Sequence, residues 1–176
     1  MRAALTRISD EVFVASEPIV RLDSSAIELV RDAALASAKG RARICAHKSA
    51  SDSLHEMVIG LTADTYVRPH RHPSKVESFH VIEGAGEVVI LTDTGTIDDV
   101  VALGDGRAFY YRLDTPRFHT VLVRSPVLVI HEVTNGPFDR AETDFAWWAP
   151  DENDGVAAKA YMADLRDKAD AWTRGA

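Results

Sequence analysis

Short runs of alternating hydrophobic and polar residues fill the middle of the chain, from about residue 42 to residue 133. The runs DDVVAL, RAFYYRL, RFHTVLV and VLVIHEV begin at residues 98, 107, 117 and 127, so they recur roughly every ten residues, with turn-forming residues between them. This rhythm is typical of an antiparallel sandwich or small barrel, in which one face of each strand is buried. The pattern therefore predicts a mainly β fold.

Glycine-containing turns mark the strand ends. The segment 78–93 predicts a β-hairpin that turns at Gly84–Gly86, and a second turn is expected at Asp93–Gly95. Upstream, residues 11–20 predict a short strand or extended arm, which Pro18 favours at a sheet edge.

Two segments with helical periodicity flank the β region. The capping box of Ser25 and Glu28 predicts a helix that begins there and ends near Ala38, with Gly40 as its C-terminal stop. Apolar residues at helical spacing predict a second helix over residues 156–173. The two apolar stripes, which we expect to face the sheet, comprise Ile27, Val30, Ala33, Ala34 and Ala38 in the first helix and Ala157, Tyr161, Leu165, Ala169 and Trp172 in the second.

Length and composition agree with one globular domain. The chain has 176 residues, of which 46% are hydrophobic and 27% charged, as in an ordinary folded protein. We expect a single domain over 1–176, in which 1–40 form an N-terminal strand and helix, 41–135 the barrel core and 136–176 a C-terminal segment and helix. No internal repeat or linker suggests a second domain.

Charge and cysteine content exclude several functions. The net charge of -7 argues against a nucleic-acid partner, because binding to phosphate backbones depends on clustered Lys and Arg. Basic residues do gather in sequence around residues 41–71, where they form either a site for an anionic small molecule or a solvated face. The single cysteine, Cys45, cannot form an intrachain disulfide and suits a reducing compartment. Without an apolar signal sequence or membrane span, we expect a cytoplasmic protein with no membrane partner.

The chemistry of the chain concentrates in residues 69–84. His70 and His72 are two residues apart on an expected strand, so their side chains share one face and both imidazoles can approach one ion. A short loop then brings Glu77 to the same point. Imidazole and carboxylate suit one divalent ion such as iron, manganese, zinc, nickel or cobalt. His119, which enters an apolar strand after a turn, is the candidate for a fourth ligand.

These residues resemble the two cupin motifs. His70-x-His72, four residues, Glu77, six residues and Gly84 match the core of the first motif. Pro116-x-x-His119 resembles the end of the second, although Arg117 stands where a glycine is usual. The resemblance implies a double-stranded β-helix (jelly-roll) barrel in which His70, His72, Glu77 and His119 hold one metal ion, with open coordination positions for water or substrate.

Strand alternation predicts the environment of the neighbouring side chains. If Glu77 points into the barrel, Phe79 and Val81 point inward too, while His80 faces outward. By the same rule His119 brings Val121 and Val123 into the lining. In VLVIHEV, alternation alone leaves open whether His131 or Glu132 faces inward.

A narrower resemblance, over roughly residues 41–150, is to the WbuC-type cupin metalloproteins of surface-polysaccharide gene clusters. Its matching features are Arg41-Ala42-Arg43 with His47, the run Tyr66-Val67-x-Pro69-His70-x-His72, and Glu132-Val133-x-x-Gly136-Pro137-Phe138. This resemblance implies that Glu132 is a second carboxylate near the metal and the candidate catalytic residue. His47, Arg43 and Lys75 are candidates to line the mouth of the site, and Tyr110 is a further candidate to touch substrate.

Several functions follow from this site. The first is a metalloenzyme that acts on a small polar molecule such as a sugar or sugar nucleotide, by isomerisation or epimerisation. The second is an iron-dependent dioxygenase, and the third a non-catalytic metal- or ligand-binding module. The sequence leaves open whether the protein is an enzyme. We expect a small-molecule ligand and, because jelly-roll sheets often pair, a homodimer.

Overall fold

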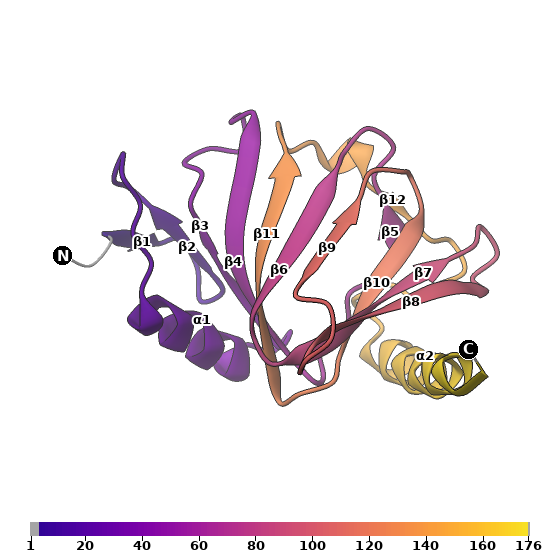
Figure 1. Cartoon of the computed structure of the whole chain (residues 1–176). Coiled ribbons are helices and arrows are strands. Elements are labelled where there is room, and N and C mark those ends of the chain that lie inside the picture. Colours follow the sequence, from indigo (N-terminus) through magenta and orange to yellow (C-terminus); the bar gives the residue numbers. More distant parts are fainter. Residues whose placement is uncertain (1–3, 176) are drawn as a thin grey trace.

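Two β-sheets face each other, and each is covered on its outside by one long helix (Figure 1). This computed structural model describes residues 4–175, so residues 1–3 and 176 at the ends of the expected domain lie outside the described residues. The mainly β fold with flanking N- and C-terminal helices is confirmed. None of the helices in the described part of the chain combines the length and apolar character that a membrane crossing requires.

The larger sheet has seven strands among the described residues, and only the pairing of β2 with β3 is parallel. In spatial order its strands are β1 (Leu5–Arg7), β2 (Val12–Ala15), β3 (Arg41–Cys45), β4 (Leu54–Thr62), β11 (Val127–Asn135), β6 (Glu77–Glu83) and β9 (Tyr110–Leu113). Strands distant in sequence are therefore neighbours in the sheet.

The smaller sheet has five antiparallel strands in the same part of the chain. Its order is β12 (Asp144–Phe145), β5 (His70–Arg71), β10 (Phe118–Val123), β7 (Ala85–Leu91) and β8 (Ile97–Gly104). The expected turn at residues 93–95 joins β7 to β8, where the Thr92 N–H donates to the Thr96 carbonyl at 2.9 Å and Gly95 has a φ of 83°.

The hairpin predicted over residues 78–93 is wrong. β6 pairs with β9 and β11 in the larger sheet, whereas β7 pairs with β8 and β10 in the smaller one. Gly84, with a φ of 82°, turns the chain from one sheet to the other, and a Cβ there would lie 2.2 Å from the Val127 carbonyl oxygen. A glycine between two apolar runs looks the same in the sequence whether the chain makes a hairpin within one sheet or crosses from one sheet to the other. The strands that pair with β6 come from much later in the chain, so the local sequence cannot show which of the two occurs.

Helix α1 (Ser24–Ala36) lies on the outer face of the larger sheet. Its N-cap is Asp23, whose carboxylate accepts from the Ser25 N–H at 3.0 Å, so the cap predicted at Ser25 lies two residues too late. Val30 and Ala34 are buried, and Gly60 of β4 lets the helix approach closely: a Cβ there would lie 2.9 Å from the Val30 carbonyl oxygen.

Helix α2 (Gly155–Gly175) packs on the outside of the smaller sheet. Leu165 and Ala169 are buried as predicted, but Trp172 is 41% exposed. The short 3-10 helix η1 (Arg140–Glu142) lies in the segment between β11 and β12.

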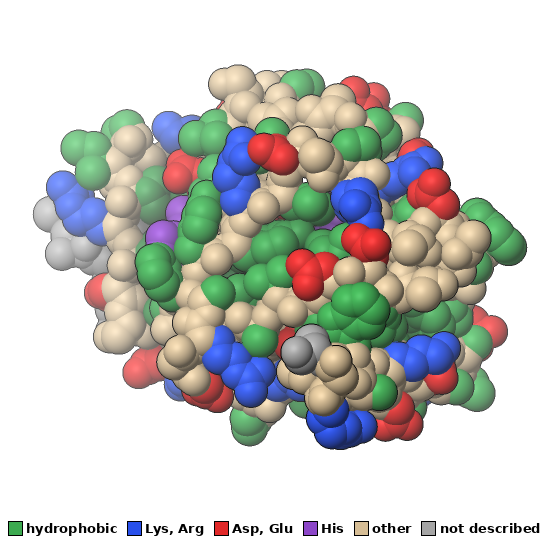
Figure 2. All heavy atoms as spheres, turned by 45° about the vertical axis from the view of Figure 1, so that its right-hand side comes forward, with side chains coloured by type: hydrophobic (Ala, Val, Ile, Leu, Met, Phe, Trp, Pro, Cys, Tyr) green, Lys and Arg blue, Asp and Glu red, His purple; other side chains and the backbone are tan. Residues whose placement is uncertain are grey.

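An apolar core fills the space between the two sheets. On the face shown in Figure 2, a hollow lined by hydrophobic side chains is bordered by acidic and basic ones.

Candidate metal centre

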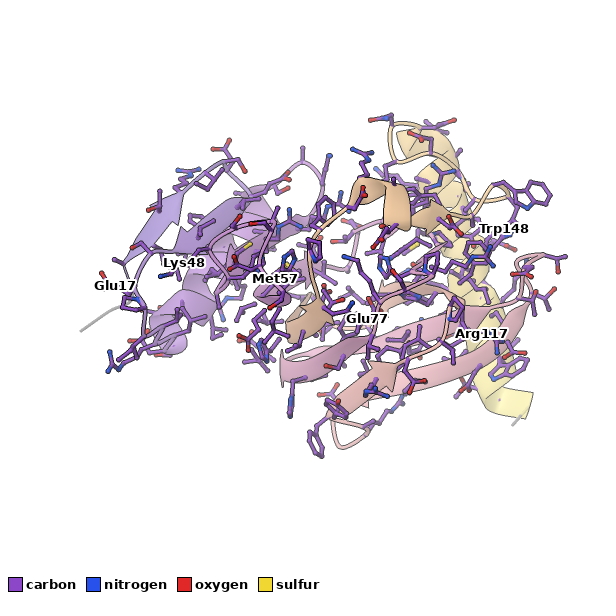
Figure 3. The ribbon with its side chains drawn as sticks, turned by 90° about the horizontal axis from the view of Figure 1, so that it is seen from above. Glu17, Lys48, Met57, Glu77, Arg117 and Trp148 are labelled. Atoms are coloured by element: carbon purple, nitrogen blue, oxygen red, sulfur yellow. The ribbon has the colours of Figure 1, made fainter. Side chains whose placement is uncertain are left out.

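Four ligand-type side chains converge between the sheets. One donor atom from each of His70, His72, Glu77 and His119 can be chosen so that all four lie within 4.8 Å of one another. In the view from above, Glu77 lies near the middle of the molecule, with Met57 on one side and Arg117 on the other (Figure 3). This cluster could hold a metal ion.

Opposite sheets supply the ligands. His70 of β5 and His119 of β10 are direct partners in the smaller sheet, and their ring centroids are 4.5 Å apart. Glu77 begins β6 of the larger sheet and reaches across from it. His72 directly follows β5, with its ring 5.0 Å from that of His70. The alternation of His70 and His72 therefore works as predicted, although the regular strand is only two residues long.

Backbone carbonyls set the orientation of two imidazoles. Nδ1 of His70 lies 2.8 Å from the Arg68 carbonyl oxygen, and Nδ1 of His119 lies 3.0 Å from that of Arg117. A carbonyl oxygen can only accept, so each Nδ1 carries a proton, and in the neutral ring each Nε2 offers its lone pair to a cation. This is the usual support of metal-binding histidines.

The cluster contains buried atoms that need a partner. Nε2 of His119 lies 2.8 Å from Oε1 of Glu77, yet their geometry is not that of a hydrogen bond, and both atoms are buried without any hydrogen-bond partner. Buried polar groups normally find one, and a group left unpaired is costly. A divalent cation bound by imidazole nitrogen and carboxylate oxygen would satisfy both atoms, so the residues present fit such an ion.

The ionisation of these groups suits cation binding. Burial lowers the pKa of His70 to about 4, so its imidazole is neutral at physiological pH. Burial alone would raise the pKa of Glu77, but the positive potential of the three imidazoles, led by His119, brings it to about 2. Burial likewise opposes protonation of His119, but Glu77 outweighs it and the pKa of His119 is raised. A bound cation would take the place of the additional proton that Glu77 favours on the His119 imidazole.

Glu132 faces the space between the sheets. It is the partner of Phe79 in β6 and of Met57 in β4, and all three side chains line one cavity. His131 faces the other way, toward the outer surface, with its Nε2 3.9 Å from Oε1 of Glu56. The ambiguity between His131 and Glu132 is thus resolved by the register of β11.

Glu132 is half-buried because it is open to the cavity, yet protein surrounds it on the other sides. Burial, and then the negative charge of Glu77, raise the pKa of Glu132 to about 8. Arg43 acts in the opposite direction without forming an ion pair with it among the described residues. A cation on the four ligands would counter the charge of Glu77 and lower this pKa.

A cavity of about 560 Å³ adjoins the cluster, and His70, His119 and Glu132 are part of its wall. Its other inner walls are apolar, formed by Met57, Ile59, Leu61, Val67, Phe79, Val121 and Ile130. The inward orientation predicted for Phe79 and Val121 is confirmed, and exposed His80 instead packs against Phe109 and Tyr110 on the outer face. A volume of this size accommodates a small organic molecule.

The residues predicted to line the mouth of the site or to touch substrate lie in different parts of the structure. Arg43 lines the cavity. Lys75 is buried elsewhere, with its ammonium donating to the Pro137 carbonyl at 2.9 Å, and His47 stacks on His55 with ring centroids 4.1 Å apart. Tyr110 is on the outer face of β9, because the register pairs it with His80. The structure brings only Arg43 of these four residues to the cavity wall.

Residues of the segment after β11 were not predicted at the site. Phe138, Arg140, Thr143 and Phe145 line the cavity from this segment, and Phe145 of β12 pairs with His70. Their sequence has no periodicity, and only the pairing of β12 with β5 brings them to the site. The one available signal was the concentration of aromatic side chains.

A buried polar row was also missed. Thr134 of β11 is the register partner of Glu77 on one side and of His55 on the other. Oγ1 of Thr134 and Nε2 of His55 are both buried without a hydrogen-bond partner. Side-chain alternation could have predicted Thr134 only if the inward orientation of Glu132 had been known.

Comparisons with known proteins support the fold. The model of a domain of unknown function, DUF6016, matches residues 22–103, which include His70, His72 and Glu77 but not His119 or Glu132. No protein of curated function matches the chain in sequence.

Three solved structures are similar in fold to this chain. Protein SO0799 from Shewanella oneidensis has a TM-score of 0.51 at 9% identity, covering 62% of this chain and 75% of its own. L-ribose isomerase from Cellulomonas parahominis has a TM-score of 0.51 at 14% identity, covering 68% and 72%. The fold is cupin-like. The DMSP lyase DddQ from Ruegeria pomeroyi scores 0.48 at 18% identity, covering 63% of this chain and 54% of its own. At these identities the cupin-like fold is what the comparison shows, and the chemistry must be argued from the site itself.

Proposed function

We propose that this cupin-like protein binds one divalent metal ion and is a metalloenzyme acting on a small polar molecule. The observation that carries the proposal is the convergence of His70, His72, Glu77 and His119 beside a cavity, with two of their donor atoms buried without a hydrogen-bond partner. A purely structural metal site is normally closed by protein ligands, whereas this cluster adjoins space for a ligand.

The reaction class that the site supports best is isomerisation or epimerisation. A divalent ion held by the four ligands would polarise a carbonyl or hydroxyl group of the substrate. Glu132 lines the same cavity, where burial raises the pKa of its carboxyl. Because a bound cation would counter the charge of Glu77 and lower that pKa, the Glu132 carboxylate would be available as a base. In an isomerisation, Glu132 would accept the proton from the carbon that bears the hydroxyl group and return it to the former carbonyl carbon. The hydroxyl proton would pass to the former carbonyl oxygen, so that no external redox partner is needed.

The proposed substrate class rests on the family resemblance of the sequence. The resemblance of residues 41–150 to WbuC-type proteins supports a sugar or sugar nucleotide of surface-polysaccharide metabolism. An open-chain sugar, or a sugar nucleotide whose sugar carries a keto group, offers the adjacent carbonyl and hydroxyl groups that proton transfer by Glu132 requires.

The apolar cavity wall favours a second candidate, an iron-dependent dioxygenase. Phe79, Val121 and Ile130 offer no hydrogen bonds to a sugar and would suit a hydrocarbon substrate. The two candidates differ in their need for oxygen. Oxygen consumption by ferrous protein with a substrate would support the dioxygenase, while turnover that is unchanged under anaerobic conditions would support the isomerase.

Metal content tests the shared part of both proposals. We expect elemental analysis of purified protein, reloaded with Zn²⁺, Mn²⁺ or Fe²⁺, to find one ion per chain, and H119A to lose it. H80A is the matched control, because His80 belongs to β6 but faces outward. Anomalous scattering at the metal edge should place the ion among the four ligands. A full metal complement in H119A would contradict the proposal, and metal that stabilises the protein without any ligand effect would favour a non-catalytic module.

A further inference from the structure

The cavity wall is richer in positive charge than the molecule as a whole. The chain carries a net charge of -7. Basic side chains nevertheless outnumber acidic ones around the cavity: Lys39, Arg41, Arg43, Arg68 and Arg140 against Glu11, Glu132 and Glu152. Clustered charge of one sign at the entrance of a cavity raises the local concentration of ligands of the opposite sign.

Some of these cations already have partners. Arg41 pairs with Glu152 at 2.9 Å, and Arg68 pairs with Asp151 at 3.0 Å. Arg43, Arg140 and Lys39 are exposed, and their side chains make no hydrogen bond or ion pair within residues 4–175. Their positive charge is therefore available to a ligand.

Arg43 is placed to reach that ligand. It is the register partner of Ile59 in β4, and Ile59 is in turn the partner of Ile130 in β11, so Arg43 projects beside an apolar part of the wall. Arg140 of η1 lines the same cavity. Beyond the apolar wall lie the imidazoles of His70 and His119.

We propose that this cavity binds a small organic anion, whose carboxylate or phosphate group is held by Arg43 with Arg140 while its hydrocarbon part lies along the apolar wall. The far end of the ligand would approach the four-ligand cluster, and this part of the inference rests on the proposed metal-dependent function. The planar guanidinium of arginine matches both carboxylate and phosphate in two-point hydrogen bonding.

Three probes with the same six-carbon chain test the inference: hexanoate, monohexyl phosphate and neutral 1-hexanol. Isothermal titration of the Zn²⁺-loaded protein at low ionic strength should show at least one anion binding about tenfold or more tightly than the alcohol. The stronger of the two anions identifies carboxylate or phosphate as the recognised group. R43Q should weaken anion binding about tenfold and leave hexanol unchanged, and R140Q should weaken it by a smaller factor.

R112Q is the matched control, since Arg112 pairs with Asp114 and is not part of the cavity wall. Unchanged unfolding temperature in R43Q would show that the substitution acts on binding, as expected for an exposed side chain without partners. The inference is overturned if neither anion binds the wild-type protein, if hexanol binds as tightly as both anions, or if R43Q binds the anions as tightly as the wild type.

The same titrations on metal-free protein separate the two proposals. If Zn²⁺ does not bind but an anion still binds in an Arg43-dependent way, the proposed metal function fails and the anion site stands. If Zn²⁺ binds and the anions do not, only the anion site fails.

Discussion

At the scale of single residues, Glu132 combines an inward position with an unusual ionisation. Burial and the charge of Glu77 raise its pKa to about 8, against about 4.3 in an unfolded chain. Between these values the folded protein holds a proton that the unfolded chain has released. The contribution of Glu132 therefore makes the folded state less stable as the pH rises from about 4 to 8. The carboxyl is kept at this position at a cost in stability, which is common at functional sites.

E132Q should therefore stabilise the metal-free protein at high pH. We expect the free energy of unfolding to rise by about 1–3 kcal/mol at pH 8.5, and the gain to shrink toward pH 4.5, where the folded carboxyl is protonated and the unfolded one is only about half ionised. Urea unfolding across this pH range measures the difference. E28Q, at an exposed position of α1, should show no such pH dependence. An equal gain for E132Q at both pH values would contradict the assignment.

At the scale of elements, Gly84 decides how the two sheets connect. Its positive φ, together with the backbone of β11 against its α-carbon, leaves no room for a side chain. The same backbone conformation occurs at Gly106, with a φ of 77°, but nothing lies within 4 Å of a Cβ there. Replacing Gly106 therefore measures the cost of the backbone conformation alone, whereas replacing Gly84 adds the cost of the steric contact with β11.

G84A should destabilise the protein much more than G106A. We expect about 1 kcal/mol for G106A from conformational strain alone, and at least about 3 kcal/mol for G84A, because the Val127 backbone must also move. Urea unfolding with a common slope gives both values. Equal losses would mean that the corner at Gly84 can relax without disturbing β11.

At the scale of the whole molecule, the metal cluster joins the two sheets. Glu77 belongs to the larger sheet and His70 and His119 to the smaller one, so a bound ion would bridge them. The metal-free protein instead holds two buried donor atoms between the sheets, Nε2 of His119 and Oε1 of Glu77, that have no hydrogen-bond partner. The expected homodimer and the single-domain organisation stay predictions.

Adding Zn²⁺ should raise the unfolding temperature in a concentration-dependent way. Binding to the folded state alone contributes about 2.7 kcal/mol when free metal is a hundred times the dissociation constant. Differential scanning calorimetry of chelator-treated protein measures the shift, and chelator should reverse it. E77Q should lose most of the shift, whereas H131A, which alters an outward-facing histidine, should keep it. A similar shift in E77Q would place the binding site elsewhere.

Much of the candidate site was predictable because it is local in sequence. His70, His72 and Glu77 follow from alternation and a short loop, and His119 from its motif. The inward orientation of Glu132 was expected only from the narrower family resemblance, since strand alternation left it open. The arrival of Phe138, Arg140 and Phe145 at the cavity was not predictable. Both depend on which strands pair, and that information is not contained in any short segment.

Residue type and spacing within short segments were enough to predict the β character of the centre, both helices and the four candidate ligands. The fold was needed to show that β6 and β7 lie in different sheets and that Glu132 rather than His131 faces the cavity. It was also needed to show that Arg43 and Arg140, which have no ion pair within residues 4–175, line that cavity. Strand pairing joins residues far apart in the chain, and the side-chain orientation of a strand follows from its partners.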